Sequence, residues 1–386
     1  MSKQKILYIA NGNSIHDVKW ISFFSNQGET FSCYLLCDTL CVLSEQTKRE
    51  LAQKNIEILP QIPPFSITNP LRTYKAIRQF RRTIKEIKPD LVHVLFATPN
   101  ALWLNFTKIP SIITMRGSDI LIVIPDLLRK SGVKRLYFKF LYRMFEKAFR
   151  KSKSVTGTSW TQIDSAKALF EGSKLALIRT GVDVSKINEI KQTELIPDSL
   201  RDNEFVFSPR FMSPIYNIEL QIEAISKLRK EILNRYTFVF IRGKQFDQHY
   251  YQEQKQKLQV LKEEINLNYI IFDYLDQSSM WMFLKKASLC MMTPISDGTP
   301  NSALEAMAAQ CPLIVSNLNY DKDLFEGTCI KLKTSESSEL AKTIELALEN
   351  YPNDFIEKGY VQVSALGNRE LEMKKLENLY KSSIVV

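Results

Sequence analysis

The chain lacks most of the features that would place it in a membrane, in a metal-binding class or in a secreted class. Its 386 residues include six cysteines, with no Cys-x-x-Cys pair, and only three histidines. No run of about 18 apolar residues is present, so no membrane-spanning helix is expected. The N-terminal residues 1–5 lead directly into a strand-like apolar run at residues 6–10, so no signal peptide is expected either. We therefore predict a cytoplasmic protein whose cysteines are reduced and packed in its core.

Several ligand-binding signatures are missing as well. The loop after the first apolar run contains Gly12, but not the Gly-x-Gly-x-x-Gly pattern of nicotinamide-binding proteins. No Asp-x-Asp pair directly follows a predicted strand, and the cysteines at 33, 37 and 41 have no histidine partners, so no metal is expected. RNA-binding and helix-turn-helix signatures are also absent, which argues against a nucleic acid partner.

What the sequence does contain is an alternation of short apolar runs with helical stretches, which is typical of parallel α/β sheets. The polar stretch 185–203, which includes Pro197, predicts a linker between two domains, 1–195 and 200–367. The predicted strands are residues 5–11, 33–37, 57–60, 91–96, 111–115, 154–159, 205–209, 237–242, 269–274, 288–293, 312–316 and 328–332.

The most informative segment is residues 296–308, Ser-Asp-Gly-Thr-Pro-Asn-Ser-Ala-Leu-Glu-Ala-Met-Ala, which directly follows an apolar run. Thr299 is the expected N-cap of a helix, and Pro300 suits its first position. The amides of residues 301–303 would then lack intrahelical partners, and amides of this kind bind phosphate. This anion site would lie at the carboxyl end of a strand, where α/β sheets bind ligands. An ordinary strand-to-helix turn is the alternative.

This segment closely resembles the donor-site signature of retaining glycosyltransferases of family GT4. Residues 113–120 are similar to that family's acceptor-side loop, 181–183 to its Gly-Val-Asp element, and 208–210 to its donor-side arginine. The resemblance implies the GT-B fold, with two Rossmann-like domains whose parallel sheets face a central cleft. It also implies that a helix at about 368–386 packs back on the first domain.

The resemblance further implies a retaining hexosyl- or acetylhexosaminyl-transferase. Such an enzyme moves a sugar from a nucleotide-sugar donor to a glycan or lipid-linked acceptor, as in bacterial-type surface polysaccharide or glycolipid assembly. It uses helix amides in place of a divalent cation, so no cofactor is expected. A non-catalytic polyanion-binding protein and a nucleotide-sugar epimerase on the same fold are the alternatives.

Donor-side roles follow at the positions that match the family's motifs. Asp297 and Glu305 have the family's eight-residue spacing of two carboxylates, although Asp297 is one methylene shorter than the usual glutamate. Arg210 resembles the clamp for the leaving phosphate, and Lys244 and Arg242 are candidates to replace the clamp lysine that is otherwise missing. A solvent-facing Lys244 is the alternative. The predicted catalytic residues are Arg210, Lys244, Asp297 and Glu305, and the predicted donor-binding residues are Tyr274, Leu275, Gly298, Thr299, Pro300, Asn301 and Ser302.

Acceptor-side candidates come from the first domain. Gly12 can adopt a positive φ, and His16 either binds an acceptor hydroxyl or caps the next helix. Arg116 stands where the family often has a histidine; because arginine pairs with phosphate, it indicates a negatively charged acceptor such as a polyprenyl-diphosphate-linked sugar. His93 lies in an apolar run and is predicted to be a core histidine. The predicted acceptor-binding residues are Gly12, Asn13, His16, Arg116 and Asp119.

Positive charge is concentrated in the first half of the chain, which has a net charge of +13 over residues 1–200 against −3 over 201–386. Between Arg129 and Lys153 ten basic residues accompany a single acid, Glu146. Residues 72–85 have a similar basic and apolar character. Basic amphipathic helices bind anionic bilayers, so we expect peripheral association with the inner face of the plasma membrane; a solvated helix face is the alternative. We call the basic residues that repeat every four positions the basic stripe: Arg135, Lys139, Arg143, Lys147 and Lys151.

Overall fold

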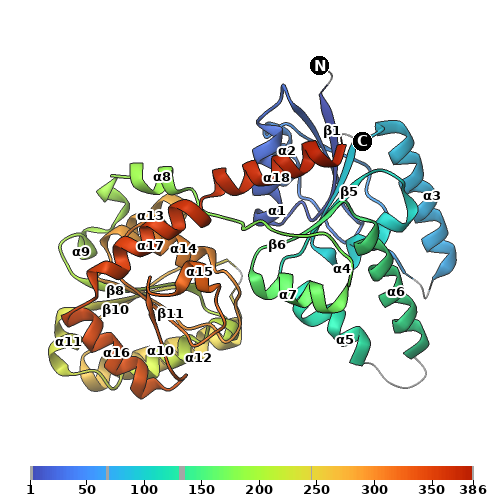
Figure 1. Cartoon of the computed structure of the whole chain (residues 1–386). Coiled ribbons are helices and arrows are strands. Elements are labelled where there is room, and N and C mark those ends of the chain that lie inside the picture. Colours follow the sequence, from blue (N-terminus) through green and yellow to red (C-terminus); the bar gives the residue numbers. More distant parts are fainter. Residues whose placement is uncertain (1–2, 67–68, 130–134, 245, 385–386) are drawn as a thin grey trace. The chain divides into compact units, whose positions relative to one another are not determined.

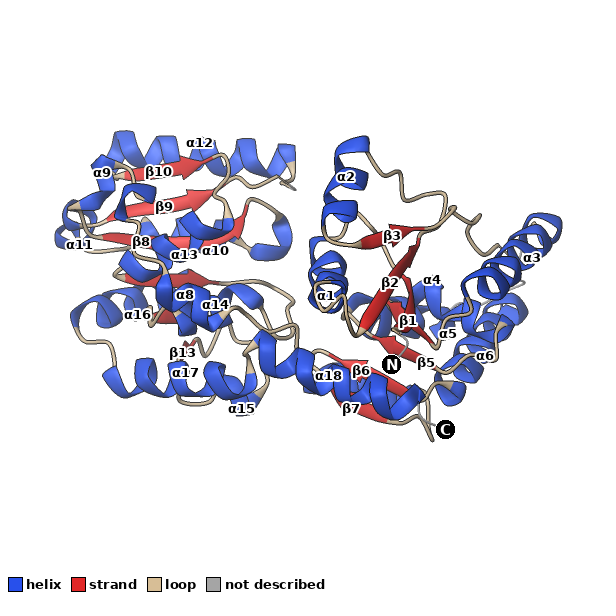
Figure 2. Ribbon diagram, turned by 90° about the horizontal axis from the view of Figure 1, so that it is seen from above, coloured by secondary structure: helices blue, strands red, loops and turns tan. Residues whose placement is uncertain are grey.

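The computed structural model describes residues 3–66, 69–129, 135–244 and 246–384, and its chain divides into two compact units (Figure 1). Unit 1 comprises Met1–Thr180 with Glu372–Val386, and unit 2 comprises Gly181–Leu371. Each unit is built on one parallel sheet with helices on both faces (Figure 2). The predicted α/β fold class is therefore confirmed.

Unit 1 contains a seven-stranded parallel sheet in the order β3-β2-β1-β4-β5-β6-β7. The order reverses between β1 and β4, and ligands of such sheets bind at the carboxyl ends of the strands near this point. Strand β4 reads Leu-Val-His-Val-Leu and is buried throughout, as expected for a strand covered on both faces. The strands are β1 (Gln4–Ile9), β2 (Phe31–Leu36), β3 (Ile56–Ile58), β4 (Leu91–Leu95), β5 (Ser111–Thr114), β6 (Ser154–Gly157) and β7 (Leu175–Leu177).

The helices of unit 1 cover the two faces of its sheet. One apolar core joins the sheet to α3, η1 and α6, and a second joins it to α1 and α18. Figure 2 shows α3 and α6 on one face and α1 on the other. The helices are α1 (Ile15–Ser25), α2 (Glu45–Gln53), α3 (Pro70–Ile87), α4 (Ala97–Asn100), η1 (Ala101–Phe106), η2 (Asp119–Val123), α5 (Ile124–Arg129), α6 (Arg135–Lys151), α7 (Trp160–Leu169) and the C-terminal α18 (Arg369–Ile384).

The C-terminal helix α18 packs on unit 1 from Glu372 onward. Its Tyr380 ring lies 4.6 Å from the ring of Phe24, and its hydroxyl is 2.6 Å from Nδ1 of His93. The Nε2 atom of His93 is 2.7 Å from the hydroxyl of Thr114. Burial, with a smaller effect of Arg116, lowers the pKa of His93 to about 3. The prediction that His93 is a core histidine is therefore confirmed.

Unit 2 contains a six-stranded parallel sheet in the order β10-β9-β8-β11-β12-β13. Its strands are β8 (Phe205–Phe211), β9 (Thr237–Ile241), β10 (Tyr269–Phe272), β11 (Leu289–Met292), β12 (Leu313–Val315) and β13 (Ile330–Lys331). Its helices are α8 (Val184–Glu189), η3 (Thr193–Leu195), α9 (Asp198–Arg201), η4 (Pro214–Tyr216), α10 (Ile218–Ile225), α11 (Lys230–Arg235), α12 (Gln248–Ile265), α13 (Gln277–Lys286), α14 (Asn301–Ala308), α15 (Lys322–Phe325), α16 (Ser337–Glu349) and α17 (Asn353–Leu366).

The division between the units falls at Thr180 and Gly181, ahead of the predicted linker. Residues 185–203 contribute to α8, η3 and α9, and Ile187 and Leu200 are buried in the core of unit 2. Gly181 has a φ of +66°, and a Cβ there would lie 2.6 Å from Cα of Arg369. The close approach of these two backbone segments therefore requires a glycine at position 181. The polar composition of 185–203 comes from its exposed residues, which is why the sequence alone suggested a linker.

All twelve predicted strands are present within a few residues of their predicted ends, and β7 was missed because it is short and only half-buried. The six cysteines are all free thiols, five of them buried. Among the described residues no helix is both long and apolar enough to cross a membrane.

Candidate functional site

The segment 296–308 forms a loop and the helix α14 at the carboxyl end of β11. The N-cap is Pro300 and not Thr299, so the predicted N-cap is wrong. The amide of Ala303 donates to the carbonyl of Pro300, so the prediction that this amide lacks a partner is also wrong. Pro300 offers no side-chain cap. Within the described ranges, the amides of Asn301 and Ser302 therefore stay without partners, and they form the positive end of the helix dipole.

Arg210 is held at this helix start by three contacts. Its Nη1 donates to the Ser302 hydroxyl at 2.8 Å, and its Nη2 pairs with Asp297 Oδ2 at 3.1 Å. Its guanidinium carbon lies 3.9 Å from the ring centroid of Tyr216. The pairing of β8 with β9 shifts between Phe207 and Phe211, and Arg210 lies in this irregularity, which aims its side chain at α14.

The Arg210–Asp297 pair is mostly shielded from solvent, with side-chain exposures of 16% and 19%. Burial raises the pKa of Asp297, while Arg210 and the amide of Gly298, which donates to its Oδ1 at 2.9 Å, lower it. The buried Nε of Arg210 has no hydrogen-bond partner within the described part of the chain. Because an unpaired buried donor costs free energy, this N–H favours an added acceptor such as a phosphate oxygen.

Glu305 projects from α14 toward α13 and is only 8% exposed. Its Oε1 accepts hydrogen bonds from Gln277 Nε2 at 2.7 Å and from Trp281 Nε1 at 3.2 Å. These two donors orient the carboxylate, although neither residue was singled out from the sequence. The two predicted carboxylates thus contact different elements: Asp297 bonds to Arg210 of β8, and Glu305 bonds to two residues of α13.

Lys244 and the predicted base-reading residues follow β9 and β10. The Lys244 ammonium lies 4.1 Å from the ring centroid of Tyr274, which is half-exposed, while Leu275 packs against the core. No contact in the described residues joins Lys244 to Arg210 or Asp297. Gly243 has a φ of +79°, and a Cβ there would lie 2.2 Å from Cβ of Phe211, so this turn must remain glycine.

The loop after β1 and the first turn of α1 carry three of the predicted acceptor residues. Gly12 does not have a positive φ, contrary to the prediction; a Cβ there would lie 2.8 Å from Cδ2 of Leu43, so the Leu43 side chain would have to shift. The side-chain amide of Asn13 donates to the carbonyl of Val42 at 2.9 Å. His16 is exposed on the first turn of α1, but Ser14 caps that helix by accepting from the amide of Asp17, which removes the capping alternative for His16.

Arg116 is the most unusual of the predicted acceptor residues, because it is a nearly buried cation at the carboxyl end of β5. Its Nη2 pairs with Asp17 Oδ1 at 3.1 Å, and its guanidinium lies 4.3 Å from the ring centroid of Trp20. Its Nε and Nη1 atoms are buried and have no partner among the residues that the structure describes. An arginine with two unsatisfied donors is prepared to receive an anion.

Asp119 was predicted to bind the acceptor, but its carboxylate is used within the protein. It is fully buried, and its oxygens accept from the amides of Ala97 at 2.7 Å, Gly117 at 2.9 Å and Ile120 at 3.0 Å, and from that of Arg116. Such a carboxylate has its acceptor capacity filled by backbone donors. Asp119 therefore positions the loop around Arg116.

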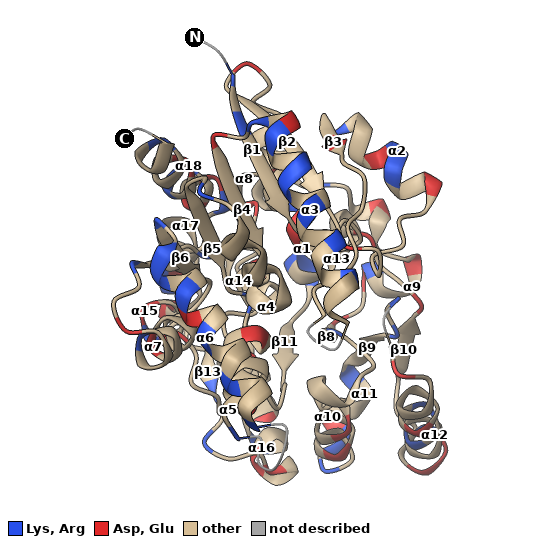
Figure 3. Cartoon of the chain, turned by 90° about the vertical axis from the view of Figure 1, so that its right-hand side faces the viewer, with Lys and Arg blue, Asp and Glu red and all other residues tan. Residues whose placement is uncertain are grey.

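The basic stripe lies on α6 (Figure 3), and its five members are all exposed. The ammonium of Lys151 is hydrogen-bonded within the protein, because it donates to the carbonyl oxygens of Leu104 and Thr107 at the end of η1. Lys130 and Lys134, which belong to the same basic segment, lie outside the described residues.

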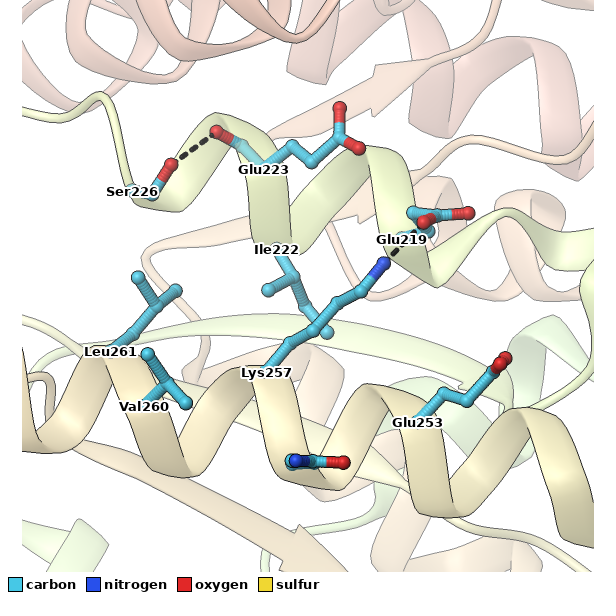
Figure 4. A pocket seen from close by; sticks show the side chains of 9 residues that line it. Glu219, Ile222, Glu223, Ser226, Glu253, Lys257, Val260 and Leu261 are labelled. Carbon is cyan, nitrogen blue, oxygen red and sulfur yellow. Dashed lines mark hydrogen bonds and ion pairs between the residues drawn. The ribbon is translucent and has the colours of Figure 1, made fainter.

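A hollow in unit 2, of about 500 Å³, lies between α10 and α12 and away from these motifs (Figure 4). Ile222 and Val260 line it, and Lys257 pairs with Glu219 across it. It is formed by helix surfaces and contains none of the predicted site residues.

The structure groups the predicted donor residues in unit 2 and the predicted acceptor residues in unit 1. Sequence reasoning missed Tyr216 beneath Arg210, Asp321, which accepts from the hydroxyl of Thr299 at 3.1 Å, and Asp17 and Trp20 beside Arg116. None of these four residues belongs to a motif. The one available signal was that Tyr216 follows Arg210 closely in the sequence.

Comparisons with known proteins point to one class of enzyme. Residues 5–159 match the family model described as glycosyl transferase 4-like, and residues 188–362 match that of glycosyl transferases group 1. No protein with a curated description matches the chain.

Solved structures with the same fold include three at low sequence identity. A glycosyltransferase from Rickettsia africae is 15% identical with a TM-score of 0.77 over 100% of both chains. Anabaena Alr3699/HepE in complex with UDP is 14% identical with a TM-score of 0.72 over 99% of this chain and 100% of that one. A UDP-forming α,α-trehalose-phosphate synthase from Burkholderia vietnamiensis is 13% identical with a TM-score of 0.72 over 98% and 100%.

Proposed function

Since this chain belongs to the group 1 glycosyl transferases and has the GT-B fold, we propose that it moves a sugar from a nucleotide-sugar donor to an anionic, lipid-linked acceptor with retention of configuration. The observation that carries the donor half is the contact of Arg210 with Asp297 and Ser302 at the open start of α14. A cation, an unpaired Nε and free helix amides converge there, as a diphosphate requires.

The chemistry assigns a role to each donor-side group. When the sugar leaves, negative charge develops on the β-phosphate of the nucleotide, and Arg210 with the amides of Asn301 and Ser302 stabilises it. Asp297 accepts hydrogen bonds from the sugar, and Glu305, oriented by Gln277 and Trp281, accepts from the ribose. Arg210 and the helix amides supply the positive charge without a divalent cation, so we propose a metal-independent reaction.

The acceptor half rests on Arg116 and on the charge of unit 1. The two unsatisfied donors of Arg116 favour a phosphate or carboxylate on the acceptor. The exposed cations of α6 and of α3 favour the anionic inner face of the plasma membrane, where a polyprenyl-diphosphate-linked sugar resides. We place the enzyme in bacterial-type surface polysaccharide or glycolipid assembly on this basis.

The function is tested with the purified full chain and a panel of UDP, GDP and CDP sugars. UDP-glucose is the first donor to assay, because Anabaena Alr3699/HepE has been crystallised with UDP-glucose. Donor turnover that persists in EDTA and gives a product with the donor's anomeric configuration by NMR supports the proposal. Failure to bind or turn over any nucleotide sugar contradicts it, and loss of turnover in EDTA contradicts the metal-independent reaction.

A further inference from the structure

Unit 1 contains an apolar cavity of about 350 Å³ that none of the predicted site residues lines. It is formed by the segment after β4, by η2 and α5, and by the inner face of α6. Its lining includes Phe96, Leu102, Val123, Leu127, Tyr137 and Leu141, with no charged residue. The volume falls within the range of roughly 300–1,000 Å³ that is typical of small-molecule pockets.

Strain in the backbone marks one wall of this cavity. Phe96, which lines it, has a φ of +70° and a ψ of 103°, a conformation that is an outlier for a bulky side chain. The neighbouring amide of Ala97 is held by Asp119, the residue that also fixes the loop around Arg116. Strained conformations of this kind cluster at ligand clamps, so the wall is shaped by more than packing.

The surroundings of the cavity expose apolar side chains that a soluble helix surface would not need. Ile122, Val123 and Leu128 on η2 and α5, and Leu136 and Phe140 on α6, are each more than 40% exposed. Val123 belongs both to the cavity lining and to this exposed group, so the cavity opens toward it. Apolar side chains exposed in this number mark an interaction surface.

Cations accompany these apolar residues. Lys139, Arg143 and Lys147 are exposed on α6, where the one acid, Glu146, is paired with Arg150 at 3.0 Å. Arg72, Lys75 and Arg78 are exposed on α3, whose Thr73 hydroxyl accepts from the amide of Ser66 at 3.1 Å, next to the cavity residue Phe65. An apolar cavity with an apolar rim and a cationic border is complementary to a hydrocarbon chain that carries a phosphate.

We propose that this cavity binds one hydrocarbon chain of a phosphate-bearing lipid, with the phosphate among the cations of α3 and α6. The inference rests on the proposed function, because a lipid-linked acceptor is the substrate that would bring such a chain to unit 1. It extends that function by assigning the hydrocarbon chain to a cavity within unit 1, in addition to the surface contact that the basic stripe alone would make with a membrane.

Calorimetry with octyl, decyl and dodecyl phosphate, below their micelle concentrations, tests the chain site directly in the full-length protein. Affinity should rise about fourfold for each added methylene until the cavity is full. Dodecyltrimethylammonium, which has the same chain and the opposite charge, should bind at least tenfold more weakly than dodecyl phosphate. An affinity that does not depend on chain length, or equal binding of the cationic amphiphile, overturns the proposal.

Two substitutions at Val123 separate the cavity from a general membrane surface. Val123→Trp fills the cavity mouth but stays apolar, so it should lose dodecyl phosphate binding at least tenfold and still sediment with anionic vesicles. Val123→Glu should lose both. The matched control is Val260→Glu on α12, because Val260 is 42% exposed and Val123 is 41% exposed. Unchanged dodecyl phosphate binding by a folded Val123→Trp protein overturns the proposal.

Nucleotide-sugar binding by the wild-type chain distinguishes a failure of this site from a failure of the proposed function, since the donor groups lie in unit 2. If donor turnover occurs and no alkyl phosphate binds, the chain site is wrong and the function stands. If alkyl phosphates bind with the expected chain dependence and no nucleotide sugar does, the proposed function is wrong and the chain site stands. Concentration-dependent dimerisation that buries the cavity, without chain-length dependence, would identify a second copy as the occupant and overturn the lipid proposal.

Discussion

Replacing Arg210 by methionine removes a cation and leaves a mostly buried carboxylate behind. Arg210→Met keeps most of the aliphatic stem but loses the bonds to Ser302 and Asp297 and the stacking on Tyr216. A hydrogen bond to a charged group contributes about 1.5–3 kcal/mol, and an exposed cation–π contact about 0.5–1 kcal/mol. Since the pair retains some exposure, we expect the free energy of unfolding of unit 2 to fall by about 2–3 kcal/mol.

The pH dependence of this loss has a defined sign. Burial raises the pKa of Asp297 and Arg210 opposes that rise, so removing Arg210 raises the pKa further. A carboxyl whose pKa is higher in the folded state destabilises the fold as pH rises through that pKa. The destabilisation by Arg210→Met should therefore be larger at high pH and shrink as pH falls, because the folded carboxyl then takes up a proton.

Arg242→Met is the matched control, since Arg242 also stacks on an aromatic ring, 4.8 Å from Phe246, and pairs with Asp273 at 3.2 Å. That pair is far more exposed, at 33% and 73% of its side chains, so its loss should cost below about 1 kcal/mol. Adding Asp297→Asn to Arg210→Met should recover about 1 kcal/mol, because it removes the unpaired charge. Urea unfolding at pH 5 and pH 8 measures all four proteins. Equal losses for the two arginines, or no recovery by Asp297→Asn, would refute this account of the site.

Three further predictions concern the donor, the core and the membrane. Glu305→Ala should weaken nucleotide-sugar binding by about 1–3 kcal/mol in calorimetry, and unchanged affinity in a folded variant would contradict its role. His93 has a folded pKa of about 3, so protonation favours the unfolded state; its contribution is complete above pH 6.5 and should fall by about 2 kcal/mol between pH 7 and 5. Urea unfolding of His93→Gln should show a shallower pH slope over this range, and an equal slope would disprove the assignment. Converting Arg135, Lys139 and Arg143 to Glu should release the protein from anionic vesicles in sedimentation assays, whereas continued sedimentation at low salt would mark the basic stripe as a solvated helix face.

The sequence by itself determined the positions of the strands in both sheets, except β7, and the location of the donor motif. Strands such as β4 and β11 are continuous apolar runs, because both faces of a parallel sheet are covered, and this pattern is local and readable. The sequence also predicted that a helix begins after residue 296, since proline and small polar residues are typical of helix N-termini. His93 was assigned to the core for the same local reason.

Only the tertiary structure decided which polar groups form hydrogen bonds with other parts of the protein. Asp119 and Lys151 looked available in the sequence, but Asp119 is used by backbone amides and Lys151 by the carbonyls at the end of η1. Ala97 lies 22 residues from Asp119 and Leu104 lies 47 residues from Lys151, separations that no local pattern encodes, although the other amide partners of Asp119 are its near neighbours. The boundary at Gly181 escaped the sequence for a similar reason, because it depends on a close approach to Arg369.

The same distinction separates the donor site from the lipid cavity. Asp297, Ser302 and Glu305 are joined by one helix and its loop, so their spacing alone predicted a common site, and only the approach of Arg210 and Trp281 needed the fold. The apolar cavity has no such motif. Its lining comes from segments spread between residues 65 and 145. In the sequence, apolar side chains at these positions cannot be distinguished from ordinary core residues, and only the fold shows that they surround a cavity.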